Sequence, residues 1–354
     1  MGKEILNMVG GLGLFLFGMS LMSESIEKVA GAKLRRILEI FTTNRFMGII
    51  VGIVFTGIIQ SSSACTAMVV SFVNAGLMNL YQAAGVILGS NIGTTVTSQL
   101  VSFKLDAVAP LFVLVGAGAI MFIKKESVKQ IGGIIVGFGI LFVGISTMKA
   151  AMQVIGEAPE VINMLMVLDN PSPFTPLLAT LIGMVVTSII QSSSVTVSIV
   201  LVMTDANLLP LPITLYIILG CNIGACTTAL LASLSGKKDA KRAALIHFWF
   251  NVIGTVLIYI VLIFAKEQII ELLKNISTDS KGVLDSGRFV ANAHTGIKIF
   301  QVLVAIPFVK PLVKLASACV RGEDKKVGYR ENYQLKYIGE KVVFNPATAV
   351  VDVV

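Results

Sequence analysis

The sequence predicts an all-α polytopic membrane protein, built from two inverted repeats and one further C-terminal helix. The first observation behind this prediction is composition: the 354 residues are 55% hydrophobic and only 14% charged, with a mean hydropathy of +0.87. Soluble domains carry about 25% charged residues, so this composition excludes that class. The second observation is an internal duplication, which places one polar motif twice inside apolar segments.

Apolar runs with the length of membrane helices occur along the whole chain. A straight helix needs roughly 20 apolar residues to cross a bilayer core of about 30 Å. We therefore predict transmembrane helices at Ile5–Met22, Ala107–Ile123, Ile131–Met148, Ala243–Ala265 and, with a more polar start, Phe289–Leu315.

The duplication consists of three blocks in the same order. Gly52–Ser63, which ends in Gln-Ser-Ser-Ser, returns 131 residues later as Gly183–Ser194. The other pairs are Leu88–Gly93 with Leu219–Gly224, and Gly11–Met22 with Gly137–Met148. We divide the chain into repeat 1 (1–123), repeat 2 (124–265), an external loop with a final transmembrane helix (266–315), and a cytoplasmic tail (316–354).

The charges of the loops predict how these parts are oriented. Lys and Arg cluster in Ser23–Arg45, Lys124–Lys129 and Lys237–Arg242, whereas Ala150–Thr175 contains neither. The positive-inside rule puts the basic loops in the cytoplasm, so the two repeats run in opposite directions. The N-terminus is then outside and the C-terminus cytoplasmic. Because the net charge of +8 is spread over loops and tail, it does not indicate a nucleic-acid partner.

Each repeated module is an apolar segment with a polar break. Phe46–Ser102 contains no charged residue, and Pro171–Gly236 contains only Asp205, which we interpret as a solvated loop end. The segments on either side of Gln60 and Gln191 are too short to span a membrane. Irregular backbone at membrane depth is tolerated only where it is buried in protein or lines a cavity. We therefore predict re-entrant or broken helices at both motifs.

The chemistry of the breaks suits an ion site without fixed charge. Sodium prefers oxygen ligands, whereas an oxyanion prefers hydroxyl and amide donors and helix N-termini. We assign the oxyanion to the serines, of which Ser61 and Ser192 could instead serve sodium: Ser61, Ser62, Ser63, Ser192, Ser193 and Ser194. We assign sodium binding or orientation to Gln60, Gln191, Asn91, Asn222, Thr66, Thr94, Thr95, Thr196, Thr227 and Thr228. Sodium is the only metal expected.

Other polar residues have simpler interpretations. Single Ser and Thr residues in membrane helices usually serve close packing, but the symmetric duplication favours a site here. His247 and His294 are predicted to be structural hydrogen-bonding groups. The four cysteines have no metal-ligand spacing and imply no disulfide framework.

These motifs resemble the type II sodium–phosphate cotransporter family. The resemblance rests on both Gln-Ser-Ser-Ser motifs, on the Gly-x-Asn-Ile-Gly turns at Gly89–Gly93 and Gly220–Gly224, and on His247-Phe-Trp-Phe-Asn251. It covers about residues 5–315. It implies a multi-pass symporter of the bacterial inner membrane that imports inorganic phosphate with more than one sodium ion, by alternating access. It implies no cofactor and no enzymatic activity, and it leaves homo-oligomers open.

The sequence departs from the family pattern at two places. His294-Thr-Gly-Ile-Lys298 has Lys where the family often has Asn, which puts a ligand role there in doubt. Many bacterial relatives also continue into a helical PhoU-like domain, which would begin near Phe344, so we expect either a short member or a shortened chain. Open alternatives are transport of another oxyanion such as sulfate or arsenate, an intramembrane serine hydrolase, and a channel.

Overall fold

The computed structural model describes residues 2–41, 44–163 and 172–322. Residues up to Arg321 form one unit, and residues from Gly322 onward form a second. Most of the predicted tail therefore lies outside the described residues. In the described part of the chain the backbone is helical, and the β pairing consists of one bridge between Thr278 and Leu284.

Five described segments are long and apolar enough to cross a membrane, which confirms the polytopic α-helical class. They are Gly2–Leu38, Glu126–Gly156, Leu211–Ser233, Lys238–Ser277 and Ser286–Cys319. The first lies in helix α1 (Gly2–Phe41), the second is α7 (Glu126–Gly156) and the fourth is α13 (Lys238–Ser277). The third joins α11 (Leu211–Gly224) to α12 (Cys226–Ser233), and the fifth runs from α14 (Ser286–Ala305) through η1 (Ile306–Phe308) to α15 (Val309–Cys319).

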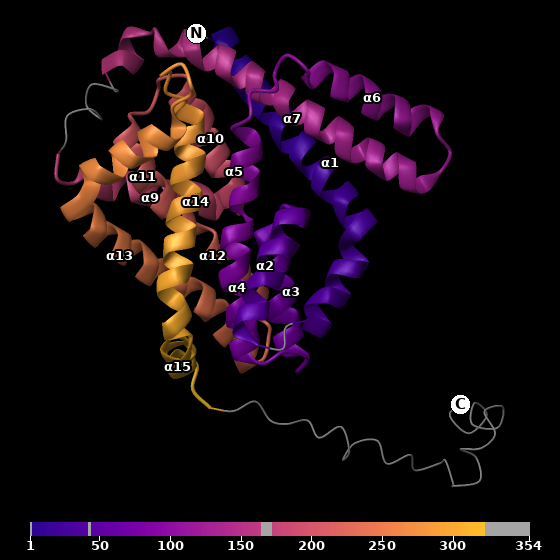
Figure 1. Ribbon diagram of the computed structural model, residues 1–354, viewed down its shortest axis with the longest axis vertical. Coiled ribbons are helices and arrows are strands. Elements are labelled where there is room, and N and C mark those ends of the chain that lie inside the picture. The colour runs from indigo at the N-terminus through magenta and orange to yellow at the C-terminus, as the bar shows by residue number, and fades with distance from the viewer. Residues whose placement is uncertain (1, 42–43, 164–171, 323–354) are drawn as a thin grey trace. The chain divides into compact units, whose positions relative to one another are not determined.

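One predicted transmembrane helix is shorter than expected. Ala107–Ile123 yields only α6 (Ala109–Phe122), whose 14 residues measure about 21 Å at a rise of about 1.5 Å per residue. Pro110 in the first turn fixes the start of the helix, and its last residue comes shortly before Lys124. Helix α6 lies along α7 (Figure 1).

Helices α1 and α7 carry the repeated glycine-rich block, and they pack against each other in opposite directions. A Cβ atom placed on Gly11 would lie 2.9 Å from the carbonyl oxygen of Gly144. A Cβ atom placed on Gly18 would lie 2.6 Å from the carbonyl oxygen of Gly137. The earlier glycine of each helix thus faces the later glycine of the other, which makes the pair antiparallel. Only glycine permits so close an approach of the two backbones.

Each module folds into four helices. The first contains α2 (Arg45–Ile59), α3 (Ser62–Asn74), α4 (Leu80–Gly93) and α5 (Thr95–Val101). The second contains α9 (Thr175–Ile190), α10 (Ser193–Asp205), α11 and α12. The first helix of each module packs along the third through a glycine, Gly89 against Ile49 and Gly220 against Thr180, and these positions are again 131 residues apart.

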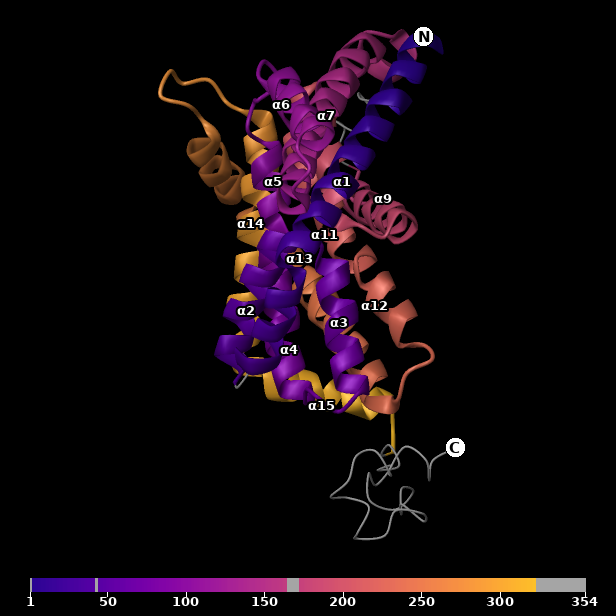
Figure 2. The ribbon, with the colours of Figure 1, turned by 90° about the vertical axis from the view of Figure 1, so that its right-hand side faces the viewer.

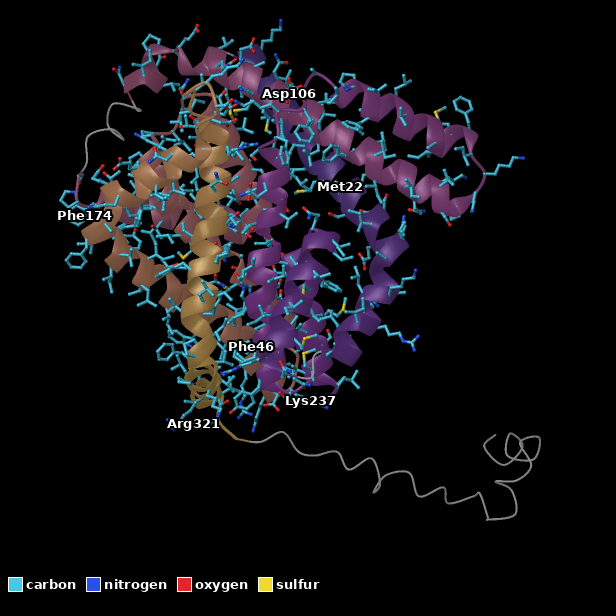
Figure 3. The ribbon with its side chains drawn as sticks, viewed as in Figure 1. Met22, Phe46, Asp106, Phe174, Lys237 and Arg321 are labelled. Carbon is cyan, nitrogen blue, oxygen red and sulfur yellow. The ribbon has the colours of Figure 1, made fainter. Side chains whose placement is uncertain are left out.

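The modules are displaced along the long axis and are connected by α14. In Figures 1 and 2, α2, α3 and α4 lie toward the end where α15 lies, and α9 and α11 lie nearer the other end. Helix α14 contacts α4 and α5 of the first module and α10 and α11 of the second. At the α15 end, Phe46 and Lys237 lie near Arg321, whereas Asp106 lies toward the opposite end (Figure 3).

The segment after residue 265 differs from the predicted loop. Helix α13 bends at Ala265, where φ is −132°, and then continues to Ser277. Ile270, Leu273 and Ser277 are buried at helical spacing, so this charged segment is an amphipathic helix rather than a loop.

Candidate functional site

The polar breaks of the two modules have the same backbone conformation. Helix α2 ends at Gln60 with φ of 61°, and α9 ends at Gln191 with φ of 59°. Each glutamine N–H closes the last turn by donating to the carbonyl of Thr56 or Thr187. Left-handed conformations are uncommon for residues other than glycine. The predicted break in each helix therefore lies at the glutamine itself.

The residue after each glutamine begins the next helix. Ser61 is the N-cap of α3, and its hydroxyl accepts a hydrogen bond from the N–H of Ala64 at 3.2 Å. Ser192 is the N-cap of α10 and accepts from the N–H of Val195 at 3.4 Å. Capping uses the oxygens of these two hydroxyls but leaves their protons free to donate. Each break therefore places serine hydroxyls at the positive end of a helix.

The two breaks contact each other. The Ser63 hydroxyl donates to the backbone carbonyl of Gln191 at 3.2 Å, and the Thr228 hydroxyl donates to the same carbonyl at 3.4 Å. The Ser194 hydroxyl lies 2.9 Å from that of Thr94. The fold thus brings Ser63 to the backbone of Gln191, 128 residues away, and Ser194 to Thr94, 100 residues away. Ser62 and Ser63 are half-buried, whereas Ser193 and Ser194 are buried.

The two glutamine side chains have different surroundings. Gln60 is buried, and its Oε1 accepts a hydrogen bond from the Thr97 hydroxyl at 2.8 Å while its Nε2 donates to the carbonyl of Gly57. Gln191 is exposed. The equivalent of Thr97 is Thr228, which bonds the backbone of Gln191. The first glutamine is therefore held in place, and the second is accessible.

Several threonines assigned to the sodium shell donate to backbone carbonyls three or four residues earlier in the chain. Thr66 donates to the carbonyls of Ser62 and Ser63, Thr95 donates to Ile92, and Thr196 donates to Ser192. Such bonds to a preceding turn satisfy a buried hydroxyl without any ligand. Thr227 donates to Ser188 Oγ at 3.1 Å, away from the serines of both motifs.

The two equivalent asparagines also differ. Asn91 Oδ1 accepts a hydrogen bond from the ammonium group of Lys298 at 2.6 Å. Asn222 is fully buried, and neither its Oδ1 nor its Nδ2 has a partner among the described residues. An amide buried in this way costs free energy unless a ligand or water completes it.

The site residues predicted from the sequence did not include three polar residues of this region. Thr97 orients Gln60, and Asn251 and Lys298 join Asn91 in one buried group. Asn251 could have been included, because it ends the His247-Phe-Trp-Phe-Asn251 motif. Lys298 could also have been included, because a lysine inside an apolar helix is a candidate functional residue by default.

The two histidines lie apart from the repeated serines. His294 Nδ1 lies 3.0 Å from the hydroxyl of Ser98, which is not part of either motif. His247 is buried, and its carbonyl accepts hydrogen bonds from Cys226 and Asn251. The hydrogen bonds found for the motif serines in the described structure go to Gln191, Thr94 and backbone groups rather than to either histidine.

Asp205 is not a solvated loop end, because it is the last residue of α10 and its side chain is ion-paired. Its carboxylate pairs with Lys149 and lies 4.0 Å from Lys104, which in turn pairs with Asp285 at 3.1 Å. Burial disfavours the charge on Lys104, but the hydrogen bond that Lys104 donates to Asp285 and the charges of Asp285, Asp205 and Asp106 together raise the pKa of Lys104 above 10.5. These ion pairs join α7, α10, the start of α14 and the segment after α5.

Comparison with known proteins connects this architecture to one family. The Na+/Pi-cotransporter family model matches residues 14–150 and 167–278. A Bacillus subtilis protein of unassigned function, YqeW, is 35% identical over 248 residues, which cover 69% of this chain and 78% of that protein. No solved structure matches.

Two relatives have names that refer to phosphate. The Escherichia coli K12 protein YjbB, provisionally named an inorganic phosphate export protein, is 26% identical over 319 residues, covering 90% of this chain and 56% of YjbB. The rat sodium-dependent phosphate transport protein 2A is 23% identical, covering 71% of this chain and 60% of that protein. The chain thus spans little more than half the length of these relatives.

Proposed function

Because this chain belongs to the Na+/Pi-cotransporter family, we propose that it imports inorganic phosphate with sodium ions by alternating access. The observation that carries this proposal is the contact between the two Gln-Ser-Ser-Ser breaks, made by the hydrogen bond from Ser63 to Gln191. This contact joins the N-terminal turn of α3 to the turn that precedes α10, and the two motifs supply six serine hydroxyls and no carboxylate. This combination suits a tetrahedral oxyanion.

The anion would bind to the serine hydroxyls and to the N-terminal turns of α3 and α10. Ser62, Ser63, Ser193 and Ser194 follow the capping serines, so their hydroxyls lie at the positive ends of the helices. Ser61 and Ser192 can add their protons, because the caps use only their oxygens. Neutral donors avoid the cost of an unpaired fixed charge while the site is empty.

Sodium would bind where amide oxygens lack partners. Asn222 supports this assignment best, because its buried carbonyl oxygen has no partner among the described residues. The exposed Gln191 side chain supplies a second amide oxygen beside the serines. The hydroxyls of Thr66, Thr95 and Thr196 already donate to backbone carbonyls of the preceding turn, so we give them a packing role.

Inverted halves would allow the site to face each side of the membrane in turn. The antiparallel packing of α1 against α7 through equivalent glycines supports this arrangement. Lys237 and Arg321 lie near the end that carries α15 (Figure 3), which favours a cytoplasmic location for that end. The start of α1 lies toward the opposite end and would then be outside (Figure 1).

Export is the second candidate direction. The similarity to YjbB favours it, because the name of that protein refers to phosphate export. A carrier moves its substrate in the direction that the coupled gradients favour. An inward sodium gradient therefore drives import if phosphate and sodium move in the same direction, and it opposes phosphate export by the same symport.

Radiolabelled phosphate flux in proteoliposomes tests the proposal. We expect faster uptake with sodium outside than with potassium outside, and a large loss of uptake in Gln191→Ala. Equal uptake in both salts would refute sodium coupling, and normal uptake by Gln191→Ala would refute the site. Efflux from loaded vesicles without external sodium would support export instead.

Two further measurements address the remaining alternatives. Competition by unlabelled sulfate and arsenate identifies the preferred oxyanion, and saturation of uptake separates a carrier from a channel. Labelling of a motif serine by a serine-reactive probe would favour a hydrolase. We expect no labelling and preferential inhibition by phosphate.

A further inference from the structure

Lys298 is a buried cationic side chain in the middle of α14. Lys298 is 1% exposed, and its neighbours in the sequence are Ile297 and Ile299. The ion pairs found among the described residues do not include it. A charge at this depth is costly unless polar groups stabilise it, and such residues usually serve the path of an ion.

Two amide oxygens stabilise the ammonium group. Lys298 Nζ donates to Asn91 Oδ1 at 2.6 Å and to Asn251 Oδ1 at 2.9 Å. These are short, charge-assisted hydrogen bonds between a compact cation and neutral oxygens. Hard cations such as sodium prefer the same kind of ligand.

Both side-chain amides are oriented toward the ammonium group by the same kind of hydrogen bond to the backbone. The NH2 group of Asn91 donates to the carbonyl of Ile87 at 2.9 Å, and that of Asn251 donates to the carbonyl of His247 at 3.0 Å. Each bond reaches back four residues along its own helix. Because the donors are occupied in this way, both oxygens point to the position that the ammonium group occupies.

The sequence shows what the lysine replaces. His247 is followed four residues later by Asn251, and His294 is followed at the same spacing by Lys298. The second motif thus has a cation where the first has an amide. In the second module, Asn222 corresponds to Asn91, and its buried amide has no such partner among the described residues.

We propose that the ammonium group of Lys298 takes the place of one coupling sodium ion, in a cation site formed by Asn91 and Asn251. This inference rests on the proposed sodium-coupled function. The protein then carries one of its coupling cations as part of its own chain. It therefore uses one sodium ion fewer per phosphate than a variant with an amide at position 298.

The sodium-to-phosphate ratio in proteoliposomes tests the inference. Lys298→Asn copies the residue of the first motif, and we expect the flux ratio of labelled sodium to labelled phosphate to rise by about one ion, with a steeper dependence on sodium. Lys310→Asn makes the same change at an exposed lysine of α15 and should keep the wild-type ratio. An unchanged ratio in an active Lys298→Asn variant would overturn the proposal.

Sodium binding provides a readout that does not depend on transport. A ligand that binds the folded state raises the melting temperature. Replacing choline by sodium should stabilise purified Lys298→Asn and Lys298→Met more than wild type, because both variants free the two amide oxygens. Met is apolar and has similar volume, so Lys298→Met separates loss of the charge from loss of packing.

The outcomes separate this inference from the proposed function. Equal stabilisation by sodium in wild type and both variants would overturn the role of Lys298, whatever the transport result. Wild-type phosphate flux without sodium dependence would refute the proposed coupling, while the sodium-dependent melting of the variants would still report the cation site. Weaker phosphate binding at every sodium concentration, with an unchanged ratio, would make Lys298 an anion ligand and overturn the proposal.

Discussion

The hydroxyl of Ser63 donates a hydrogen bond to the backbone carbonyl of Gln191, at 3.2 Å and across 128 residues of sequence. This bond joins the start of α3 to the end of α9, and therefore joins the two modules at their polar breaks. The reciprocal pair is different, because Ser194 contacts Thr94 rather than Gln60. Two similar sequences thus form an asymmetric contact.

Removal of the Ser63 hydroxyl should reduce transport. We expect Ser63→Ala to lower the initial rate of phosphate uptake at least about fivefold, the equivalent of one hydrogen bond worth about 1 kcal/mol. Ser71→Ala, at an exposed serine of the same helix whose hydroxyl donates to the carbonyl of Ala67, should leave the rate unchanged. Equal rates in both variants would indicate that the contact between the breaks has no role in transport.

Two substitutions at Gln191 separate its backbone from its side chain. At φ of 59°, glycine relieves strain that alanine retains. Gln191→Gly should therefore unfold at a higher temperature than Gln191→Ala, by the equivalent of about 1 kcal/mol. If the side-chain amide binds an ion, both variants lose sodium-dependent uptake. Recovery of uptake in the glycine variant alone would assign the role to the backbone turn.

The broken helices were predictable because their signal is local. A polar Gln-Ser-Ser-Ser inside an apolar segment has to end one helix and cap the next, and the duplication indicated that the two breaks act together. The left-handed backbone of Gln60 and Gln191 was not part of this prediction. The length of α6 was overestimated, because the apolar run Ala107–Ile123 does not show that the helix begins at Ala109, with Pro110 in its first turn.

The group around Lys298 was not predictable from local sequence. Lys298 and Asn91 are 207 residues apart, and only the packing of α14 against α4 brings them together. The same holds for Asp205, whose partner Lys149 lies 56 residues earlier. The sequence places Asp205 before a loop, but no local pattern indicates which cation pairs with its carboxylate.

Glycine at position 220 is required for the packing of α9 along α11. A Cβ atom there would clash with the carbonyl oxygen of Thr180, because the two atoms would be much closer than van der Waals contact allows. This oxygen belongs to the backbone and cannot rotate away. We expect Gly220→Ala to destabilise the protein by about 1–3 kcal/mol, seen as a lower melting temperature in detergent. Gly118→Ala, with no atom within 4 Å of the new methyl group, should be neutral or slightly stabilising. Similar melting temperatures would contradict this tight packing.

Loss of the Asp205 carboxylate should weaken the ion pairs that connect α7, α10 and α14. Asp205→Asn leaves Lys149, whose side chain is 28% exposed, without its carboxylate, and we expect a loss of about 1 kcal/mol in unfolding free energy. Glu160→Gln, the same change at an exposed carboxylate, should have little effect. Added salt should reduce the difference in unfolding free energy between wild type and Asp205→Asn, because it screens the ion pairs of the wild type.

The pH dependence of this ion-pair group follows from Lys104. Its pKa is raised above 10.5, so its contribution to stability is fully present below about pH 10.5 and is lost only as the pH rises further. The difference in melting temperature between wild type and Asp205→Asn should therefore stay constant from about pH 6 to 9. A difference that disappears within this range would show that Lys104 does not stay charged beside Asp285 and Asp205.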